Sequence, residues 1–177
     1  MERFIHFLLV CLVTALLPSP VYSQWYASAG ASVAFARDSR VDRDPAPGVS
    51  MAVGYRWEIM RVEAEWAAPS IGPATIAGLS GAVYVEPFHF GSWTPYGVAG
   101  AGWAVISGRD AFTGHGSFTA IFFTGIGVEY AIGGQWSVAA DLRHYISDDE
   151  RFARSNGGLT NFRANVIGLR VRYQFGG

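Results

Sequence analysis

The sequence predicts an all-β protein, specifically an eight-stranded antiparallel up-and-down transmembrane β-barrel. Three observations carry this prediction. Residues 161–175, NFRANVIGLRVRYQF, alternate apolar and polar side chains two apart, as in a strand with one apolar and one polar face. Similar alternating runs recur along the chain, with Gly, Pro, Asp and Asn between them. The chain also begins with an export signal, so the apolar faces can meet lipid.

The N-terminal residues have the features of a cleaved signal peptide. A short head with one arginine precedes an apolar run that ends at Pro18. This run is shorter than the roughly 20 residues that a spanning helix needs, which argues against an uncleaved membrane anchor. We therefore expect cleavage after Ser23, which gives a signal peptide over residues 1–23 and one barrel domain over residues 24–177.

Composition excludes several classes of function. The formal net charge is −1, so the chain lacks the basic excess of a nucleic-acid-binding protein. The single cysteine, Cys11, lies inside the expected signal peptide, which leaves the barrel domain without thiol chemistry. His89, His115 and His144 lack the spacing of metal ligands, and no glycine motif precedes a helix as a phosphate loop would. We expect no metal, no cofactor and no nucleic-acid partner.

Eight runs are expected to form strands joined by connections of alternating length. The links near Glu58 and at Gly133-Gly134 are tight, whereas four others are long and polar. Short periplasmic turns and long extracellular loops are typical of outer-membrane barrels. The fifth run is too rich in Gly and Ala for its two faces to be assigned. The expected strands are residues 25–35, 49–57, 60–68, 77–86, 94–106, 117–132, 136–145 and 161–175, and the expected long loops are residues 37–47, 69–76, 107–116 and 147–160.

One face of these strands carries charges of both signs in equal number. An eight-stranded barrel has an interior just wide enough for side chains to fill. Unpaired charges would cost several kcal/mol each there, so a balanced set favours ion pairs that plug the interior. The solvated face of a soluble sheet and a narrow solute channel remain as alternatives. The ten residues are Arg56, Arg61, Glu63, Glu65, Glu86, Glu129, Asp141, Arg143, Arg170 and Arg172.

The opposite faces form an apolar band with aromatic residues at its ends. Aromatic side chains of this kind gather where a barrel crosses the membrane–water interface. The connection 87–93 is long for a periplasmic turn and carries three further aromatics, which we interpret as interface anchors, with a periplasmic docking site as the alternative. The expected interface residues are Trp25, Tyr55, Trp57, Tyr130, Trp136, Tyr173 and Phe175, and those in the connection are Phe88, Phe90 and Trp93.

Three segments resemble a known family. TPYGVAGAGW (94–103), GVEYAIGGQWSVAADLRHY (127–145) and IGLRVRYQF (167–175) are similar to the outer-membrane β-barrel domain of Gram-negative bacteria, which includes opacity porins and the membrane domain of outer-membrane protein A. The resemblance covers essentially all of the chain after the signal. It implies an integral location in the outer membrane and recognition of the C-terminal strand by the barrel-assembly machinery. Members of the superfamily include adhesins, structural anchors, evasion factors and a few enzymes.

The hypothesis that the protein is an enzyme depends on one segment. A family of barrel lipid A deacylases uses a His and a Ser two apart on one strand face, and residues 144–158, HYISDDERFARSNGG, are faintly similar. Here His144 and Ser147 are three apart, so a continuous strand would point them to opposite faces. We expect no enzyme activity and keep a lipid A modifying hydrolase as an alternative.

The first long loop carries the candidate surface contacts. Arg37, Arg40 and Arg43 stand there among aspartates. Arginine forks bind phosphate well, so these residues are candidates for contact with lipopolysaccharide, although a merely solvated loop explains them equally. Together these features predict a non-enzymatic surface or envelope protein with a structural or binding role. Its expected partners are outer-membrane lipid, lipopolysaccharide and an unidentified surface ligand.

Overall fold

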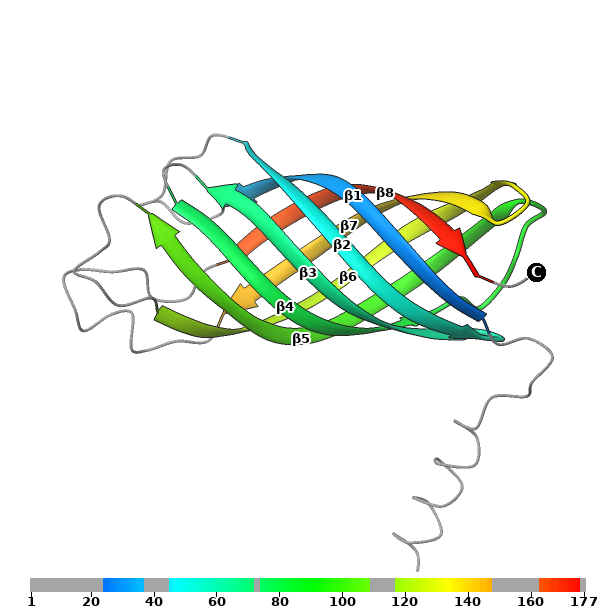
Figure 1. The fold of residues 1–177 in the computed structure, drawn as a ribbon, viewed down its shortest axis with the longest axis horizontal. Coiled ribbons are helices and arrows are strands. Elements are labelled where there is room, and N and C mark those ends of the chain that lie inside the picture. The colour runs from blue at the N-terminus through cyan, green and yellow to red at the C-terminus, as the bar shows by residue number, and fades with distance from the viewer. Residues whose placement is uncertain (1–23, 37–44, 72–73, 109–116, 148–162, 176–177) are drawn as a thin grey trace, which may run out of the picture.

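Eight antiparallel strands close a barrel in chain order, with β8 hydrogen-bonded back to β1 (Figure 1). The computed structural model describes residues 24–36, 45–71, 74–108, 117–147 and 163–175. The predicted all-β, eight-stranded antiparallel barrel is confirmed. No helix in this described part of the chain is long and apolar enough to span a membrane. The strands are β1 (Gln24–Ala36), β2 (Ala46–Trp57), β3 (Met60–Ile71), β4 (Ala74–Val85), β5 (Trp93–Gly108), β6 (Ser117–Gly133), β7 (Trp136–Ser147) and β8 (Arg163–Gln174).

The two ends of the barrel differ in their connections. The β2–β3, β4–β5 and β6–β7 turns lie at one end, together with the start of β1 and the end of β8 (Figure 1). We call this the turn end. At the β6–β7 turn, Gly133 and Gly134 have φ angles of 141° and 57°, which glycine adopts without steric cost. The other end, where the longer connections of the sequence belong, is called the loop end.

The predicted loop over residues 69–76 is wrong. Strands β3 and β4 continue through most of this segment, and Ser70 pairs with Thr75. Pro69 has no backbone N–H to donate to a neighbouring strand, so a proline at this position in the sequence indicates the end of a strand. Pairing nevertheless resumes beyond it, because the neighbouring strands hold the backbone extended on both sides.

Alternation along each strand separates an inner face from an outer face. The clearest case is β5, whose faces the sequence could not assign because Gly and Ala occur on both and remove the contrast in hydropathy. Tyr96, Val98 and Ala104 are buried inside the barrel, whereas Trp103 is 68% exposed on the outer wall. Whether a residue stands at an odd or an even position along the strand therefore determines which face its side chain points to.

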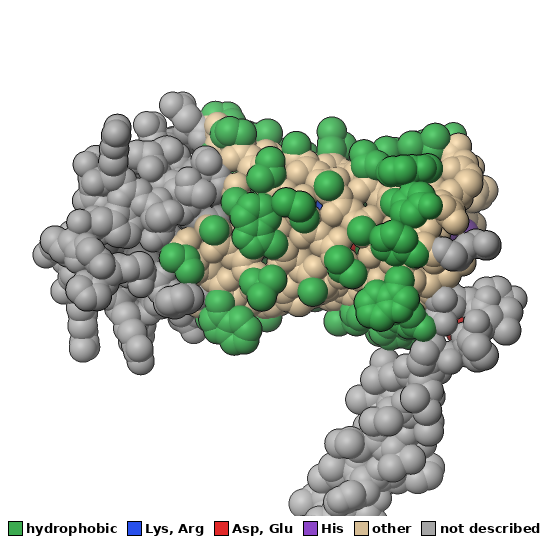
Figure 2. Space-filling view, viewed as in Figure 1, with side chains coloured by type: hydrophobic (Ala, Val, Ile, Leu, Met, Phe, Trp, Pro, Cys, Tyr) green, Lys and Arg blue, Asp and Glu red, His purple; other side chains and the backbone are tan. Residues whose placement is uncertain are grey.

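The outer wall is apolar over most of its height. Figure 2 shows hydrophobic side chains spread over the visible wall, with charged side chains almost absent from it. Exposed apolar patches on soluble monomers rarely exceed a few hundred Å², and a wall of this kind fits a hydrocarbon environment. Large exposed members on different strands include Met51, Leu79, Trp103, Ile126 and Leu169.

Candidate functional site

The interior of the barrel holds a concentrated set of charges. All ten residues that the sequence assigned to the polar faces lie there: nine are at most 6% exposed, and the side chain of Arg56 is 19% exposed. They come from β2, β3, β6, β7 and β8, and from Glu86 directly after β4. Strands far apart in the sequence thus supply neighbouring side chains.

Near the turn end, two arginines share two carboxylates. Arg56 Nη2 lies 3.0 Å from Glu86 Oε1 and 2.7 Å from Glu129 Oε2. Arg61 Nη1 also contacts both carboxylates, and it lies 2.7 Å from Glu129 Oε2. Arg172 pairs with Glu129 as well. Three cations around two anions leave a local excess of positive charge, which the next layer balances.

The next layer toward the loop end holds two arginines and three carboxylates. Arg143 Nη1 lies 2.8 Å from Glu65 Oε2, and its Nη2 lies 3.1 Å from Asp141 Oδ2. Arg170 Nη2 lies 2.8 Å from the same Glu65 oxygen, and its Nη1 lies 3.1 Å from Glu63 Oε2. Arg143 thus joins a carboxylate of β3 to one of β7, and Arg170 spans the two carboxylates of β3 and lies 3.5 Å from Asp141 Oδ2 on β7, as the forked guanidinium allows.

Glu63 joins the two layers into one network. Its Oε1 lies 3.3 Å from Arg172 Nη2 and 3.9 Å from Arg61 Nε, while its other oxygen contacts Arg170. As a result, every one of the ten charges has an opposite charge within ion-pair distance, and all ten are connected. We call this set the interior network.

Interior tyrosines complete the interior network, and the sequence did not single them out as functional. Tyr26 and Tyr84 each donate a hydrogen bond to Glu63, at 2.8 and 2.6 Å, and Tyr96 donates one to Asp141 at 3.3 Å. The Arg61 guanidinium carbon lies 4.1 Å from the centre of the Tyr84 ring and 4.6 Å from that of Tyr96. Their strands β1, β4 and β5 carry no charged residue, so the only signal in the sequence is their place on the strand face opposite the outward apolar side chains.

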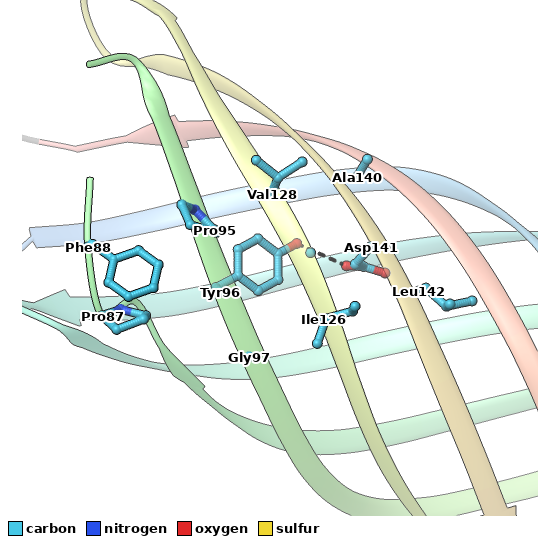
Figure 3. A pocket seen from close by; sticks show the side chains of 11 residues that line it. Pro87, Phe88, Pro95, Tyr96, Gly97, Ile126, Val128, Ala140, Asp141 and Leu142 are labelled. Carbon is cyan, nitrogen blue, oxygen red and sulfur yellow. Dashed lines mark hydrogen bonds between the residues drawn. The ribbon is translucent and has the colours of Figure 1, made fainter. Parts of the chain in front are cut away.

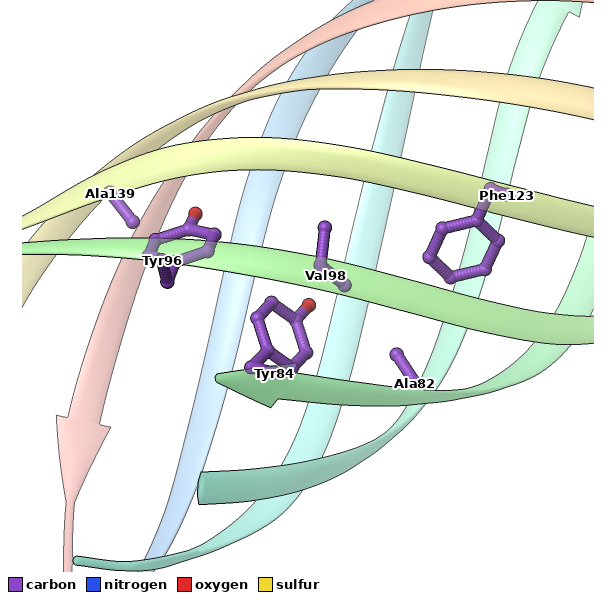
Figure 4. Packing of buried hydrophobic residues seen from close by; sticks show 6 residues of the cluster. All are labelled: Ala82, Tyr84, Tyr96, Val98, Phe123 and Ala139. Atoms are coloured by element: carbon purple, nitrogen blue, oxygen red, sulfur yellow. The ribbon is translucent and has the colours of Figure 1, made fainter. Parts of the chain in front are cut away.

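Aromatic rings fill the interior beside the charges. Figure 4 shows Tyr84, Tyr96, Val98 and Phe123, which come from the adjacent strands β4, β5 and β6 and are buried together inside the barrel. The Tyr84 and Tyr96 rings meet edge to face at 5.5 Å. Because these rings and the charged layers occupy the same cross-sections, the interior is filled by side chains in its turn-end half.

A separate apolar groove opens on the outer wall. It has a volume of about 600 Å³ and lies beside the turn that follows β4, where Pro87 and Phe88 lie next to the start of β5 (Figure 3). Gly97 leaves open space on its floor. The lining side chains are almost all apolar, which suits a lipid acyl chain and not a polar substrate. The lining includes Pro87, Phe88, Pro95, Gly97, Ile126, Val128, Ala140 and Leu142.

A closed eight-stranded barrel with an apolar wall and a paired polar interior matches one family. Residues 7–175 match the model of the outer membrane protein beta-barrel domain. The chain belongs to this family. It is therefore an outer-membrane β-barrel of the Gram-negative type. No curated protein sequence matches the chain significantly.

Solved structures of outer-membrane barrels share this fold. Neisserial surface protein A superposes with a TM-score of 0.70 at 18% identity, over 85% of this chain and 97% of that chain. The N-terminal β-barrel domain of OprF from Pseudomonas aeruginosa gives 0.56 at 16% identity, over 86% and 99%. Ail, the attachment invasion locus protein of Yersinia pestis, gives 0.54 at 12% identity, over 88% and 100%.

The expected interface aromatics of this outer-membrane barrel gather at its turn end. Trp25, Trp136 and Phe175 are exposed on the outer wall. The Trp25 and Tyr55 rings lie 5.2 Å apart, and the Trp136 and Tyr173 rings 4.8 Å apart. The other expected residues lie in the same region, with Tyr130 exposed and Trp57 partly exposed. Phe88 and Phe90 in the β4–β5 connection and Trp93 at the start of β5 are also exposed.

The candidate hydrolase residues do not come together. His144 lies on the outer face of β7, between the exposed Leu142 and Ile146, whereas Ser147 is 7% exposed on the inner face. Within the described ranges, no group of His, Cys, Asp and Glu is arranged to hold a metal ion. Arg37, Arg40 and Arg43 lie outside the described residues.

Proposed function

We propose that this protein is a non-enzymatic barrel of the outer membrane, with a structural or binding role at the cell surface, whose interior is closed by the interior network. The observation that carries this proposal is the complete pairing of five arginines with five carboxylates inside an eight-stranded barrel. A barrel of this size has room for side chains or for a water path, but not for both at one level.

The energetics of the pairs favour closure. Moving one partner aside to admit an ion would leave a buried charge without compensation, which costs about 3–5 kcal/mol for a pair of this type. Because Glu63 and Glu129 each contact three arginines, a displaced arginine would disturb several pairs at once. Thermal opening of the whole network is therefore rare.

A narrow solute channel is the second candidate, and one observation favours it. Toward the loop end the inner face carries small side chains, and Ser32, Ser50, Ser80 and Gly100 are partly exposed there. Leakage of an entrapped small solute from liposomes that contain the refolded chain distinguishes the two readings. Retention of the solute by a folded barrel is the expected result, and release at a rate proportional to the amount of barrel would favour the channel.

The hydrolase alternative has a direct test. The outward His144 and the inward Ser147 lie on opposite sides of the wall, so they cannot act on one lipid ester together. We expect the refolded protein to release no fatty acid from lipopolysaccharide. Release that a Ser147→Ala variant abolishes would establish the hydrolase.

The surface role is assigned to the loop end. The solved relatives include a surface protein and an attachment invasion locus protein that was crystallised with a heparin analogue, sucrose octasulfate. In this chain, Arg37, Arg40 and Arg43 are our candidates for contact with lipopolysaccharide phosphates. Changing the three together to Ala should weaken the association of the protein with lipopolysaccharide. Unchanged association would rule out these arginines as lipopolysaccharide contacts. We also propose that the barrel-assembly machinery recognises the C-terminal strand β8, with Tyr173 near its end and Phe175 directly after it.

A further inference from the structure

Polar side chains interrupt the apolar outer wall at the loop end of β7 and β8. Along the outer face of β8, the exposed residues Val171, Leu169 and Ile167 are followed by Asn165 and then Arg163. His144 on β7 lies directly opposite Asn165 in the register. We call Arg163, His144 and Asn165 the rim cluster. It lies on the outside of the wall, so the interior network does not use it.

The rim cluster has a defined geometry. His144 Nδ1 lies 2.8 Å from Asn165 Oδ1. An amide oxygen can only accept, so Nδ1 carries the hydrogen, and Nε2 is left for another partner. Arg163 pairs in the ladder with Ile146, two residues beyond His144 on the same face, and it is exposed. Arg163 makes no ion pair with another described residue, and its guanidinium carries five N–H donors.

The depth of the rim cluster matches the polar edge of the outer leaflet. Arg163 stands twelve residues before Phe175, which directly follows β8 at the turn end, a path of about 40 Å at roughly 3.3 Å per residue. With a strand tilt of about 40°, this is roughly 30 Å along the membrane normal, just beyond an apolar band about 25 Å tall. Asn165 and His144 then lie at the edge of that band.

Apolar neighbours flank the polar groups. Phe122 on β6 and Ile146 on β7 are paired in register and exposed on the same wall. Phe35 on β1, which pairs with Asn165, is exposed on the other side. A ligand at the rim cluster would therefore meet donors for an anion at its head and apolar side chains along its tail, which is the chemistry of a phosphorylated lipid.

We propose that the rim cluster binds the phosphate of an outer-leaflet glycolipid, the phosphorylated glucosamine headgroup of lipopolysaccharide. Arg163 supplies a fork for two phosphate oxygens, and the Asn165 amide holds the His144 ring toward the same space. The Nε2 atom of His144 is left to contact the headgroup, and the acyl chains lie against Phe122 and Ile146. This site goes beyond the proposed closed barrel and beyond the loop arginines, because it stands whether or not the interior conducts.

The test measures lipid retention by the folded barrel. The mature chain, refolded in detergent, is titrated with bisphosphorylated lipid A, with the same lipid after dephosphorylation, and with inorganic phosphate, and bound lipid is counted by native mass spectrometry. The variants are Arg163→Gln and His144→Gln. Arg109→Gln, the same charge change at a residue that lies between β5 and β6 in the sequence, and His89→Gln, a histidine at the turn end, are the matched controls. Heat-modifiable mobility in gels verifies that each variant is folded.

We expect Arg163→Gln to weaken retention of bisphosphorylated lipid A about tenfold, the effect of one lost charge-assisted contact. His144→Gln should weaken it less, and both controls should leave it unchanged. Equal binding of the dephosphorylated lipid would overturn the phosphate assignment. Equally tight binding of inorganic phosphate would overturn the assignment to a lipid. Equal loss with Arg109→Gln would show that net charge alone attracts the lipid and would overturn the site.

Discussion

The ring of Tyr26 on β1 occupies the space that a side chain at Gly54 on β2 would need. A Cβ built on Gly54 would overlap the ring carbon Cζ and the hydroxyl oxygen of Tyr26. The same arrangement recurs where the Tyr96 ring covers Gly127. In both cases the glycine lets a tyrosine cross to its neighbour strand and reach a carboxylate, Glu63 or Asp141.

Gly54→Ala should therefore destabilise the barrel. The added methyl group displaces the Tyr26 ring and weakens its hydrogen bond to Glu63, at an expected cost of about 1–3 kcal/mol in the free energy of unfolding. Urea unfolding in lipid vesicles, followed by tryptophan fluorescence, measures the change. The matched control is Gly81→Ala on β4, where a Cβ meets no atom within 4 Å. Equal stabilities of the two variants would refute this explanation of Gly54.

Removing Arg61 should cost more than removing an exposed arginine. Arg61→Met deprives Glu86 and Glu129 of a buried partner, with an expected loss of about 3–5 kcal/mol. The double variant Arg61→Met/Glu86→Gln restores the charge balance and should lose less than the single one. Arg163→Met on the outer rim should change stability by about 0.5 kcal/mol or less in vesicles without lipopolysaccharide.

The same unfolding assay decides this prediction. If the single and double Arg61 variants unfold at one denaturant concentration, the charges are not coupled in the way that their distances indicate. If Arg61→Met behaves like Arg163→Met, the buried pairs contribute nothing that an exposed arginine lacks.

The tryptophans should report the apolar band. Trp66 and Trp103 are exposed on the outer wall toward its loop-end half, whereas Trp25 and Trp136 lie near the turn end. In single-tryptophan variants, lipids brominated deep in the acyl chain should quench Trp66 more strongly than Trp25. An aqueous quencher should show the reverse order. Strong aqueous quenching of both Trp66 and Trp103 would contradict a lipid-facing wall.

Much of this architecture is encoded in period-two alternation. Because side-chain direction in a strand depends on parity alone, the sequence was enough to separate charged positions such as Arg170 and Arg172 from the apolar Leu169 and Val171 beside them. The alternation could not be used on β5, where the two faces do not differ in hydropathy. It also gave the wrong end for β3, because Pro69 resembled the end of a strand. Neither case reflects an unusual structure, since both strands are regular in the barrel.

Partner choice inside the barrel could not be predicted. Glu63 meets Arg170 and Arg172, which lie 107 and 109 residues away, because the stagger between β3 and β8 brings them to one level. Alternation gives the face of each residue but not this stagger. Tyr26 and Tyr84 were missed as network members for another reason: a tyrosine fits an apolar wall, an interface or a polar interior, and only its hydroxyl partner distinguishes them.

The most direct test of the closed interior is single-channel conductance across a planar bilayer, for the wild-type mature chain and for a variant with Arg56, Arg61, Glu86 and Glu129 all changed to Ser. This variant removes equal numbers of positive and negative charges from the turn-end layer. We expect a folded wild-type barrel to give no steps and the variant to conduct. Stable, reproducible steps from the wild-type barrel would contradict the account, because ions would then pass beside charges that the structure shows fully paired.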